Sequence, residues 1–567
     1  MGRQDLYDSI VELGRRRGYF WPSFEIYGGV GGFIDLGPLG TRIMQKLEAK
    51  WRDTFIRQEE LVEISTPIIT PKRVFEASGH VEHFRDPMTE CRKCGKRFRA
   101  DQVIAEAAQR EVEGESLERL DEIISELDIR CPECGGELLK TQYFITMFTT
   151  NIGPYSDAVG YARPEAAQGM FTDFKRVFEV TREQLPLGVA QIGRAMRNEI
   201  SPRQGPIRLR EFTIMEFEFF FDPEAPACER LNKVLSDRIR IIPASLRSEG
   251  EREAVETTIR KALESGYIVS DWMAYFMALS ARFLNGLGVP FDKQRFEEKL
   301  PAERAHYSRQ TFDHQVLLSR WGWTEVAGFA YRGDYDLSRH IEYSKVDMRV
   351  FKSLDGPKLK KTIIVKPNHA ELGRAFRERA PMIADRLAKA DYSAVKEGFD
   401  RRGYFEVDGF KILPSMVSIE EVEKRETGCR FIPHAVEPSF GAERLFYALL
   451  EYAYTKRGGR VVMSIPKDLS PYEVSVFPLV SKDGLDEIAR KVFETLMDAG
   501  FYVFFDDKGS IGRRYARADE AGIPLAITVD YQTKKDDTVT VRERDTWQQL
   551  RVEISQAPQT IRALLKT

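Results

Sequence analysis

Residues 190–221, AQIGRAMRNEISPRQGPIRLREFTIMEFEFFF, constrain the fold more than any other part of the chain. The pattern predicts two antiparallel strands joined by a polar loop that contains arginine. Successive side chains of a strand point to opposite faces, so Arg197 and Glu199 share one face of the first strand. One face of the second strand carries an aromatic, an aliphatic and two acidic side chains: Phe212, Ile214, Glu216 and Glu218. Arginine can hold a phosphate, a ring can stack on a base, and carboxylates can hold an ammonium group. The pattern therefore favours a pocket for ATP and an amino acid, and the alternative is a surface hairpin with solvated charges.

The arrangement resembles motif 2 of the class II aminoacyl-tRNA synthetases, in which an Arg-x-Glu strand, a loop and a Phe-bearing strand follow one another. The strings RNEISPR and IRLREFTIMEFE are similar to those of the glycyl-tRNA synthetases of archaeal and eukaryotic type. The resemblance implies an α+β fold with an antiparallel sheet flanked by helices. It also implies ATP-dependent attachment of glycine to tRNA(Gly) through a glycyl-adenylate, with release of AMP and pyrophosphate.

A helix followed by a strand precedes this hairpin. Apolar residues at i, i+4 spacing predict a helix over about residues 38–60: Leu39, Ile43, Leu47, Trp51 and Phe55. The strand ELVEISTPIIT comes next. This pair resembles motif 1, the dimerisation element of class II synthetases, and implies a homodimer. Without the other motifs it reads equally as a simple helix–strand unit.

Residues 431–458 are predicted to pass from a strand through Gly441 into an amphipathic helix. They resemble motif 3, whose arginine corresponds to Arg444, in the first turn of the helix where the helix dipole also favours anions. The resemblance implies that Arg197 and Arg444 are the catalytic residues, at the α-phosphate and the γ-phosphate of ATP.

Further residues of the ATP site follow from the same resemblance. Phe212 would stack on one face of adenine, with the other face open to Arg444, and Glu199 would accept from the adenine amino group. Arg208 would contact phosphate, and Glu325 would bind the Mg²⁺ that accompanies ATP. The complete predicted ATP-binding set is Arg197, Asn198, Glu199, Arg208, Leu209, Phe212, Glu325, Val326 and Arg444.

The strings RPEAAQGMF, TIMEFE and EPSFG resemble the glycine pocket of these enzymes. They imply the glycine-binding residues Glu165, Glu216, Glu437, Pro438 and Ser439. Several carboxylates can compete for an ammonium group, and bulk can exclude a Cβ. The chain departs from the family pattern at Ala166, where Thr is expected, and at Tyr331, where Asp or Asn is usual.

Four cysteines form two Cys-x-x-Cys-Gly turns, at Cys91, Cys94, Cys131 and Cys134. Two such turns can direct four thiolates at one tetrahedral zinc ion, which would be structural because no ligand position is left open. Two disulfides or four free thiols are the alternatives. The Glu-rich run between the pairs, residues 104–127, is predicted to be helical.

The remaining histidines and cysteines receive no chemical role from the sequence. His80 and His83 are predicted to lie on the surface, and His306 and His340 to be structural. Cys228 and Cys429 are predicted to be packed thiols.

The last hundred residues alternate strands and helices, which predicts a mixed α/β sheet. They resemble the anticodon-binding domain of class IIa synthetases, and Arg513, Arg514 and Arg517 predict a basic edge for RNA. Lys358, Lys360 and Lys361 form a basic cluster in an earlier insertion, which reads either as an acceptor-stem contact or as a solvated charged hairpin.

These patterns divide the chain into eight segments. The segments are 1–75, catalytic core with motif 1; 76–140, zinc-ribbon-like insertion; 141–227, core with motif 2; 228–320, mostly helical; 321–340, a core loop; 341–430, insertion with possible acceptor-stem contact; 431–460, core with motif 3; and 461–567, anticodon-binding domain.

Bulk charge does not attract nucleic acid, because 85 Lys and Arg face 88 Asp and Glu, for a net charge of −3. Any RNA contact must use local basic patches. No apolar run of about 18 residues occurs, which predicts no membrane span. The N-terminus lacks a signal sequence, so we expect a cytoplasmic protein. Two rivals remain: a synthetase for another small amino acid such as proline, serine or threonine, and a catalytically inactive synthetase-like RNA-binding protein.

Overall fold

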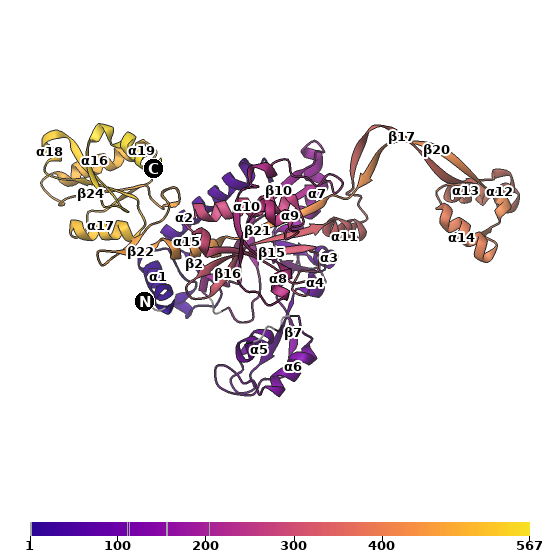
Figure 1. Cartoon of the computed structure of the whole chain (residues 1–567), viewed down its shortest axis with the longest axis horizontal. Helices are drawn as coiled ribbons and strands as arrows, with labels where there is room; N and C mark the ends of the chain where they lie inside the picture. The colour runs from indigo at the N-terminus through magenta and orange to yellow at the C-terminus, as the bar shows by residue number, and fades with distance from the viewer. Residues whose placement is uncertain (1–2, 110–111, 113, 155–156, 203–204, 567) are drawn as a thin grey trace. The chain divides into compact units, whose positions relative to one another are not determined.

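The computed structural model describes residues 3–566 except 110–111, 113, 155–156 and 203–204, and omits the side chains of residues 3–5, 354–362 and 423–426. The chain divides into two compact units, Met1–Met348 with Pro433–Thr567, and Arg349–Ile432, and each is described by itself (Figure 1). Among the described residues, no helix has the length and apolar character needed to span a bilayer.

A nine-stranded sheet forms the centre of the first unit. In spatial order its strands are β13 (Val255–Thr258), β12 (Arg238–Ile242), β14 (Gln294–Glu298), β15 (Gln310–Leu318), β16 (Gly322–Gly333), β21 (His434–Gly441), β11 (Glu211–Phe221), β10 (Leu187–Met196) and β3 (Val62–Glu63). All pairs are antiparallel except β12 with β14 and β10 with β3. The predicted fold class, an antiparallel sheet flanked by helices, is confirmed.

The side chains of strand β11 alternate between the two faces of the sheet, of which one packs on the hydrophobic core and the other is called the site face below. Phe217 and Phe219 point to one face, where they contact Trp51 of helix α2 (Pro38–Trp51) and Phe276 of helix α10 (Asp271–Gly286). Phe220 points to the other face and contacts helix α7 (Ala167–Val180). The period of two predicted this division.

Two local expectations are wrong, and a third is met only in part. Strand β10 ends at Met196, so Arg197 and Glu199 lie in the turn after it and not in the strand. Residues 228–320 are not mostly helical, because β12, β13, β14 and β15 lie there beside α10. The Glu-rich run 104–127 is not one continuous helix but parts of two, α5 (Ala100–Ala108) and α6 (Leu117–Glu126).

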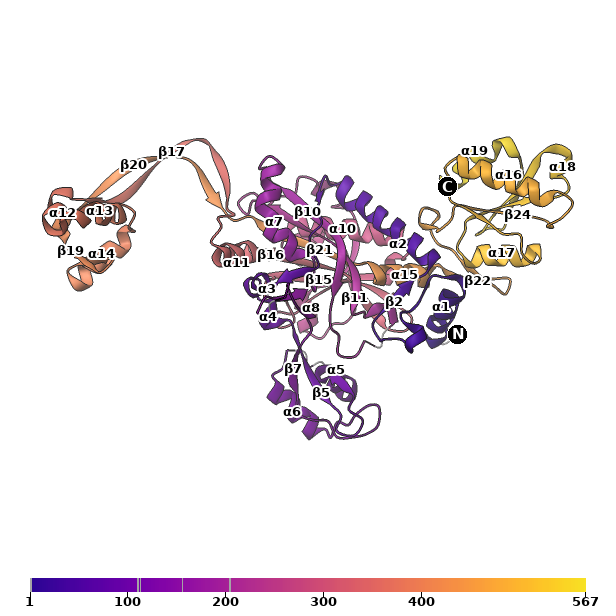
Figure 2. The same ribbon diagram turned by 180° about the vertical axis from the view of Figure 1, so that it is seen from behind.

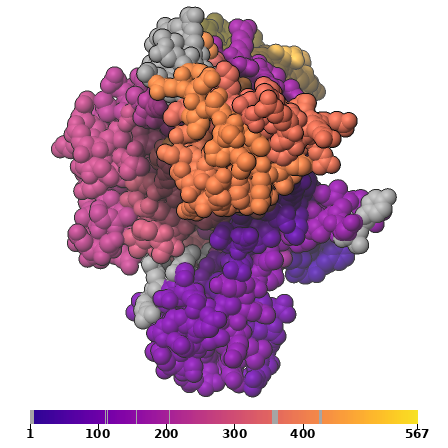
Figure 3. Space-filling view, turned by 90° about the vertical axis from the view of Figure 1, so that its right-hand side faces the viewer, coloured from indigo at the N-terminus to yellow at the C-terminus, as the bar shows by residue number. Residues whose placement is uncertain are grey.

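The cysteine-bearing insertion has its own core, to which α5, α6 and β6 (Arg97–Arg99) contribute, and β6 pairs in a three-stranded sheet with β5 (Arg85–Glu90) and β7 (Gln142–Ile145). The space-filling view shows it as a compact body (Figure 3). The predicted C-terminal α/β domain is also present. Its mixed five-stranded sheet runs β25 (Val503–Phe505), β24 (Val474–Pro478), β26 (Leu525–Val529), β27 (Thr538–Glu543) and β28 (Gln549–Glu553).

The second unit is built on a long antiparallel ribbon of β17 (Val350–Pro367) and β20 (Val417–Phe431) (Figure 2). Helices α12 (His369–Phe376), α13 (Ala380–Ala388) and α14 (Tyr392–Arg402) follow β17, and the short strands β18 (Phe405–Val407) and β19 (Phe410–Ile412) complete the unit. The side chains of Lys358, Lys360 and Lys361 are outside the described residues, so the predicted basic cluster stays a prediction.

Candidate active site

One cavity of about 200 Å³ lies on the site face of the sheet and collects most of the predicted residues. The predicted residues that line it are Glu165, Arg197, Glu199, Arg208, Leu209, Phe212, Glu216, Glu325, Val326, Glu437, Ser439 and Arg444. Asn198 and Pro438 do not line the cavity, and the backbone N–H of Asn198 donates to the carbonyl oxygen of Thr146 at 2.6 Å.

Arginines mark one end of the cavity. The Arg197 guanidinium lies 5.4 Å from the ring of Phe212 and 5.5 Å from the ring of Phe84, and its Nε donates to the carbonyl oxygen of Pro164 at 3.2 Å. A cation held by two rings and a carbonyl group is fixed in position before any anion arrives. Phe84 was not predicted as part of the site.

Arg444 lies in the first turn of α15 (Ala442–Ala453), as predicted. It donates to the carbonyl oxygen of Ile207 and to the carboxylate of Glu325, both at 2.9 Å. Desolvation opposes ionisation of Glu325, but Arg444 and Lys299 hold the pKa of this carboxyl group below its ordinary value. Glu325 is therefore an anion at the cationic end of the cavity.

The predicted loop residues Glu199 and Arg208 form an ion pair of 3.0 Å. Arg208 also donates to the amide oxygen of Gln102 at 3.2 Å. Both side chains are thus engaged with protein groups at the cavity wall.

Carboxylates mark the other end. Glu216 is fully buried and accepts from Ser439 Oγ at 2.9 Å and from the backbone N–H of Ala166 at 2.5 Å. Burial and the nearby Glu165 raise the pKa of Glu216 to about 7. The position where Ala166 replaces the expected Thr therefore contributes its backbone N–H to the site.

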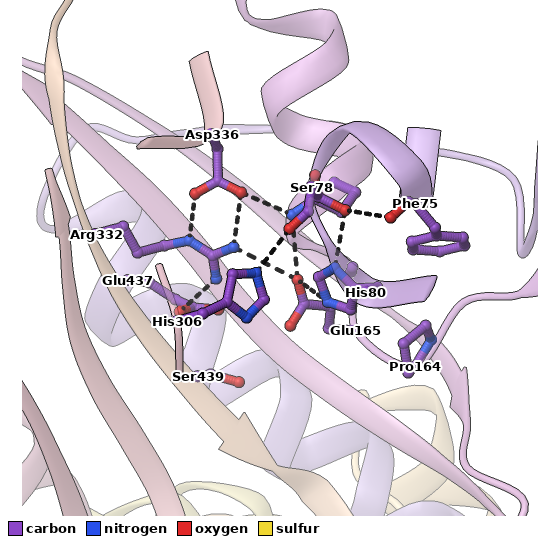
Figure 4. Close-up of polar contacts among 12 residues, drawn as sticks. Phe75, Ser78, His80, Pro164, Glu165, His306, Arg332, Asp336, Glu437 and Ser439 are labelled. Atoms are coloured by element: carbon purple, nitrogen blue, oxygen red, sulfur yellow. Dashed lines mark hydrogen bonds and ion pairs between the residues drawn. The ribbon is translucent and has the colours of Figure 1, made fainter. Parts of the chain in front are cut away.

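Arg332, which the sequence did not single out, is the central cation of the carboxylate end. Its guanidinium is bidentate to Asp336, with distances of 2.8 and 2.9 Å, and donates to Glu437 at 2.8 Å (Figure 4). Burial nevertheless raises the pKa of Glu437 to about 8, against the effect of Arg332. Two carboxylates with raised pKa values in one buried cluster can accept a cation from outside.

The surface prediction for His80 is wrong. Its side chain is 2% exposed, and Nε2 lies 3.2 Å from Oε1 of Glu165. A lone histidine carries no sequence signal that separates this position from a surface one. His306 and His340 are held by Ser78 and by Gln168, respectively, as expected of structural histidines.

Glu443, which the sequence did not single out, is buried. Its carboxylate accepts from the backbone N–H and hydroxyl of Thr213 and from Arg194. It links α15 to the motif 2 hairpin. Tyr331, the second departure, contacts Nδ1 of His434 through its hydroxyl group at 2.7 Å.

The four paired cysteines converge, with all four sulfur atoms within 4.8 Å of one another. Cys91 Sγ and Cys134 Sγ are 3.5 Å apart, and Cys94 Sγ and Cys131 Sγ are 3.8 Å apart, so the disulfide alternative is wrong. A tetrahedral ion with metal–sulfur bonds of about 2.3 Å separates its sulfur ligands by about 3.8 Å. The cluster therefore fits a metal ion of that kind.

Two predictions outside the cavity are wrong. The expected basic edge is reduced, because Arg514 is 2% exposed and donates to backbone carbonyl groups, while Arg517 pairs with Asp506 at 2.6 Å. Only Arg513 of the three is exposed. Cys429 is exposed and not packed, whereas Cys228 is buried as expected.

Known proteins resemble this chain over its whole length. The glycine–tRNA ligase of Aeropyrum pernix is 50% identical over 97% of this chain and 95% of its own length. The corresponding ligase of Thermococcus gammatolerans is 47% identical over 99% of both chains, and that of Pyrococcus horikoshii is 46% identical over 100% of this chain and 99% of its own.

The C-terminal domain matches the family model described as an anticodon-binding domain, over residues 473–564. Two solved structures share the fold. Both are of prolyl-tRNA synthetase from Cryptosporidium parvum, one complexed with L-proline and AMP and the other with halofuginone and AMPPNP. They have TM-scores of 0.52 and 0.53 and are 12% and 13% identical in sequence, covering 98% and 99% of this chain and 74% and 75% of their own.

Proposed function

The chain belongs to the glycine–tRNA ligase family, and from this premise we propose that it attaches glycine to tRNA(Gly) with ATP, through a glycyl-adenylate, releasing AMP and pyrophosphate. The observation that carries the proposal is one cavity whose lining combines the arginines Arg197, Arg208 and Arg444 with the buried carboxylates of Glu165, Glu216 and Glu437. Such a cavity suits a molecule pair in which phosphate charge and an ammonium group lie at opposite ends.

Activation requires in-line attack of the glycine carboxylate on the α-phosphate, during which charge builds on phosphoryl oxygens. Arg197 is assigned to the α-phosphate because its guanidinium is already held between two rings and a carbonyl group. Arg444 is assigned to the γ-phosphate end and Arg208 to a further phosphate contact.

Phe212 is assigned to stacking on adenine, since its ring lines the cavity beside Arg197. Glu199 would accept from the adenine amino group. For these two assignments, Phe212 would exchange its contact with Arg197, and Glu199 its ion pair with Arg208, for contacts with ATP. Asn198, Leu209 and Val326 complete the proposed ATP site through their positions in the sequence motifs.

Mg²⁺ would enter with ATP and neutralise phosphate charge. Glu325 is the residue assigned to hold it, and its anionic state suits a hard cation that prefers oxygen ligands. Asp313 lines the same cavity and adds a second carboxylate near Glu325.

Glycine is assigned to the part of the cavity that Glu165, Glu216, Glu437 and Ser439 line, where Ser439 donates to Glu216. Pro438 lies in β21 between the proposed glycine-binding residues Glu437 and Ser439. The ammonium group of glycine would add a second cation to this acidic cluster, in which Arg332 faces several carboxylates.

Zinc is proposed for the four-cysteine cluster, with a structural role, because four thiolates fill a tetrahedral shell. A homodimer is proposed from the motif 1 resemblance of α2. The C-terminal domain is proposed to bind the anticodon and the Arg349–Ile432 unit to approach the acceptor stem of tRNA(Gly). A cytoplasmic location fits six cysteines, all within the described residues, of which none forms a disulfide.

Amino-acid-dependent exchange of pyrophosphate into ATP tests the proposal, with glycine, alanine, serine and proline compared in parallel. Exchange with glycine alone is the expected result. Exchange with another amino acid would retain the activation chemistry and overturn the glycine pocket. No exchange with any of the four, from folded protein with Mg²⁺, would favour the inactive synthetase-like rival.

A further inference from the structure

We propose that His80 is a positioning residue for the amino-acid substrate, acting through Glu165. The proposal rests on the proposed function and deepens it, because it names what gives Glu165 one defined orientation. His80 begins the short helix α4 (His80–His83), outside every motif that suggested the site.

Three donors converge on one oxygen atom of Glu165. Oε1 lies 3.2 Å from His80 Nε2, 3.3 Å from Gln168 Nε2 and 3.6 Å from an Arg332 guanidinium nitrogen. Figure 4 shows His80 and Arg332 on the side of the Glu165 carboxylate that points away from Ser439. Oε2 is therefore the oxygen assigned to the ammonium group of glycine. Glu165 lines the cavity that glycine is proposed to occupy.

The chemistry of its partners fixes the tautomer of His80. An ionised carboxylate offers only acceptors, so Nε2 must carry the proton that faces Glu165. The other ring nitrogen, Nδ1, lies 2.8 Å from the hydroxyl of Ser78, which can serve as donor or acceptor. His80 and Arg332 together hold the pKa of Glu165 below its usual range although the group is desolvated. Glu165 thus stays an anion beside Glu216 and Glu437.

The backbone turn before His80 is also held in place. Gly79 has φ +82°, and a Cβ added there would lie 2.7 Å from His306 Nε2. His306 Nε2 lies 2.9 Å from the carbonyl oxygen of Ser78. A side chain at Gly79 would displace His306, so the turn presents the imidazole of His80 to Glu165 in a single way.

Aromatic contacts surround the imidazole ring. His80 stacks on Phe84 at 5.8 Å and on Tyr307 at 6.4 Å, and contacts Phe75 at 5.4 Å between ring centroids. Water is kept from the ring, which is 2% exposed, so the contact with Glu165 is not screened by solvent.

Two amide substitutions at His80 distinguish the positioning of Glu165 from a purely structural role of the side chain. His80→Gln carries an N–H group far enough along the side chain to reach Glu165, whereas His80→Asn bears the same amide on a shorter chain that falls short. We expect His80→Asn to raise the glycine KM about tenfold, the scale on which loss of an orienting partner acts, with the ATP KM unchanged. His80→Gln should stay within about threefold of the unmodified enzyme.

The control is His369→Asn, at an exposed histidine of the second unit, which should leave the glycine KM unchanged. Equal glycine KM values in His80→Gln and His80→Asn would overturn the inference, as would a parallel rise in the KM for ATP. Failure of the unmodified protein to exchange with glycine would instead overturn the proposed function. The two failures are therefore distinguishable.

Discussion

Glu216 and Ser439 face each other as register partners on β11 and β21, and Ser439 Oγ donates to Glu216 Oε2 at 2.9 Å. The antiparallel pairing thus brings together a carboxylate of the motif 2 hairpin and a hydroxyl of the strand that leads into motif 3. Residues separated by more than two hundred positions in the chain become one wall of the pocket.

Replacing Glu216 by Gln should raise the glycine KM at least tenfold and leave the ATP KM unchanged, because the amide keeps the shape but cannot attract an ammonium group. Pyrophosphate exchange at varied glycine and varied ATP measures both constants. Glu211→Gln, on the opposite face of the same strand, is the matched control. An unchanged glycine KM would remove Glu216 from the ammonium site.

Glycine use should depend on pH near neutrality. Burial raises the pKa of Glu216 to about 7, so this group is protonated below that pH and ionised above it. Glycine kcat/KM should therefore fall as the pH drops through about 7, by up to about tenfold per unit. The pH profile of kcat/KM for ATP is the internal control. A glycine profile that is flat from about one pH unit below this pKa to about one unit above it would contradict the assignment.

Arg197→Ala should lower adenylate formation by about 100-fold or more while the protein stays folded, because a preorganised cation is lost at developing phosphoryl charge. The exchange rate at saturating glycine reports the effect, and circular dichroism reports folding. Arg176→Ala removes an arginine whose side chain is 80% exposed on α7 and should behave as the unmodified protein. Normal exchange in Arg197→Ala would exclude the phosphate role.

Glu218 is fully buried, and neither carboxylate oxygen has a hydrogen-bond partner among the described residues. Burial and Glu437 raise the pKa of Glu218 well above its ordinary value. Folding therefore takes up a proton, and the native state loses stability relative to a neutral variant as the pH rises above about 4.3.

Glu218→Gln should accordingly match the unmodified protein near pH 5 and become more stable than it toward pH 8. The gain approaches about 1.4 kcal/mol per pH unit over the range where the buried group stays protonated. Thermal unfolding across this range measures it. A stability difference that does not grow with pH would show that Glu218 is ionised in the folded protein.

Purified protein should contain about one zinc ion per chain, and Cys131→Ser should lose it, because a buried thiolate is removed from a closed tetrahedral set. Elemental analysis gives the metal content. Cys429→Ser, at an exposed thiol of the second unit, should retain the ion. Equal metal content in both variants would reject the four-cysteine site.

Periodicity predicted the parts of the site that lie on regular elements. Phe212, Ile214 and Glu216 share the cavity face of β11 because strand side chains alternate, and Arg444 falls in the first turn of its helix. The fixed spacing of each Cys-x-x-Cys turn brings its own two thiols to one side, although the meeting of the two turns depends on the fold of the insertion. In these cases local geometry alone determines where the side chain points.

The sequence could not predict the residues that support those groups. Arg332 lies at the end of one strand and Asp336 in the first turn of the next helix, so no single period relates them. His80 turns inward because of a glycine turn and a distant histidine, His306. Arg514 was assigned to a basic edge, but backbone carbonyl groups of the preceding loop draw it inward. Such outcomes depend on tertiary contacts that carry no short-range signal.

The ribbon of the second unit has a consequence for protein engineering. Val350 and Phe431 are register partners, so some eighty residues leave and return at points one strand spacing apart, about 5 Å. A two-residue hairpin turn spans that gap. The whole unit is therefore a module that can be excised, shortened or exchanged between relatives without altering the register of the flanking chain, which makes chimeric ligases a practical test of the acceptor-stem contact proposed for it.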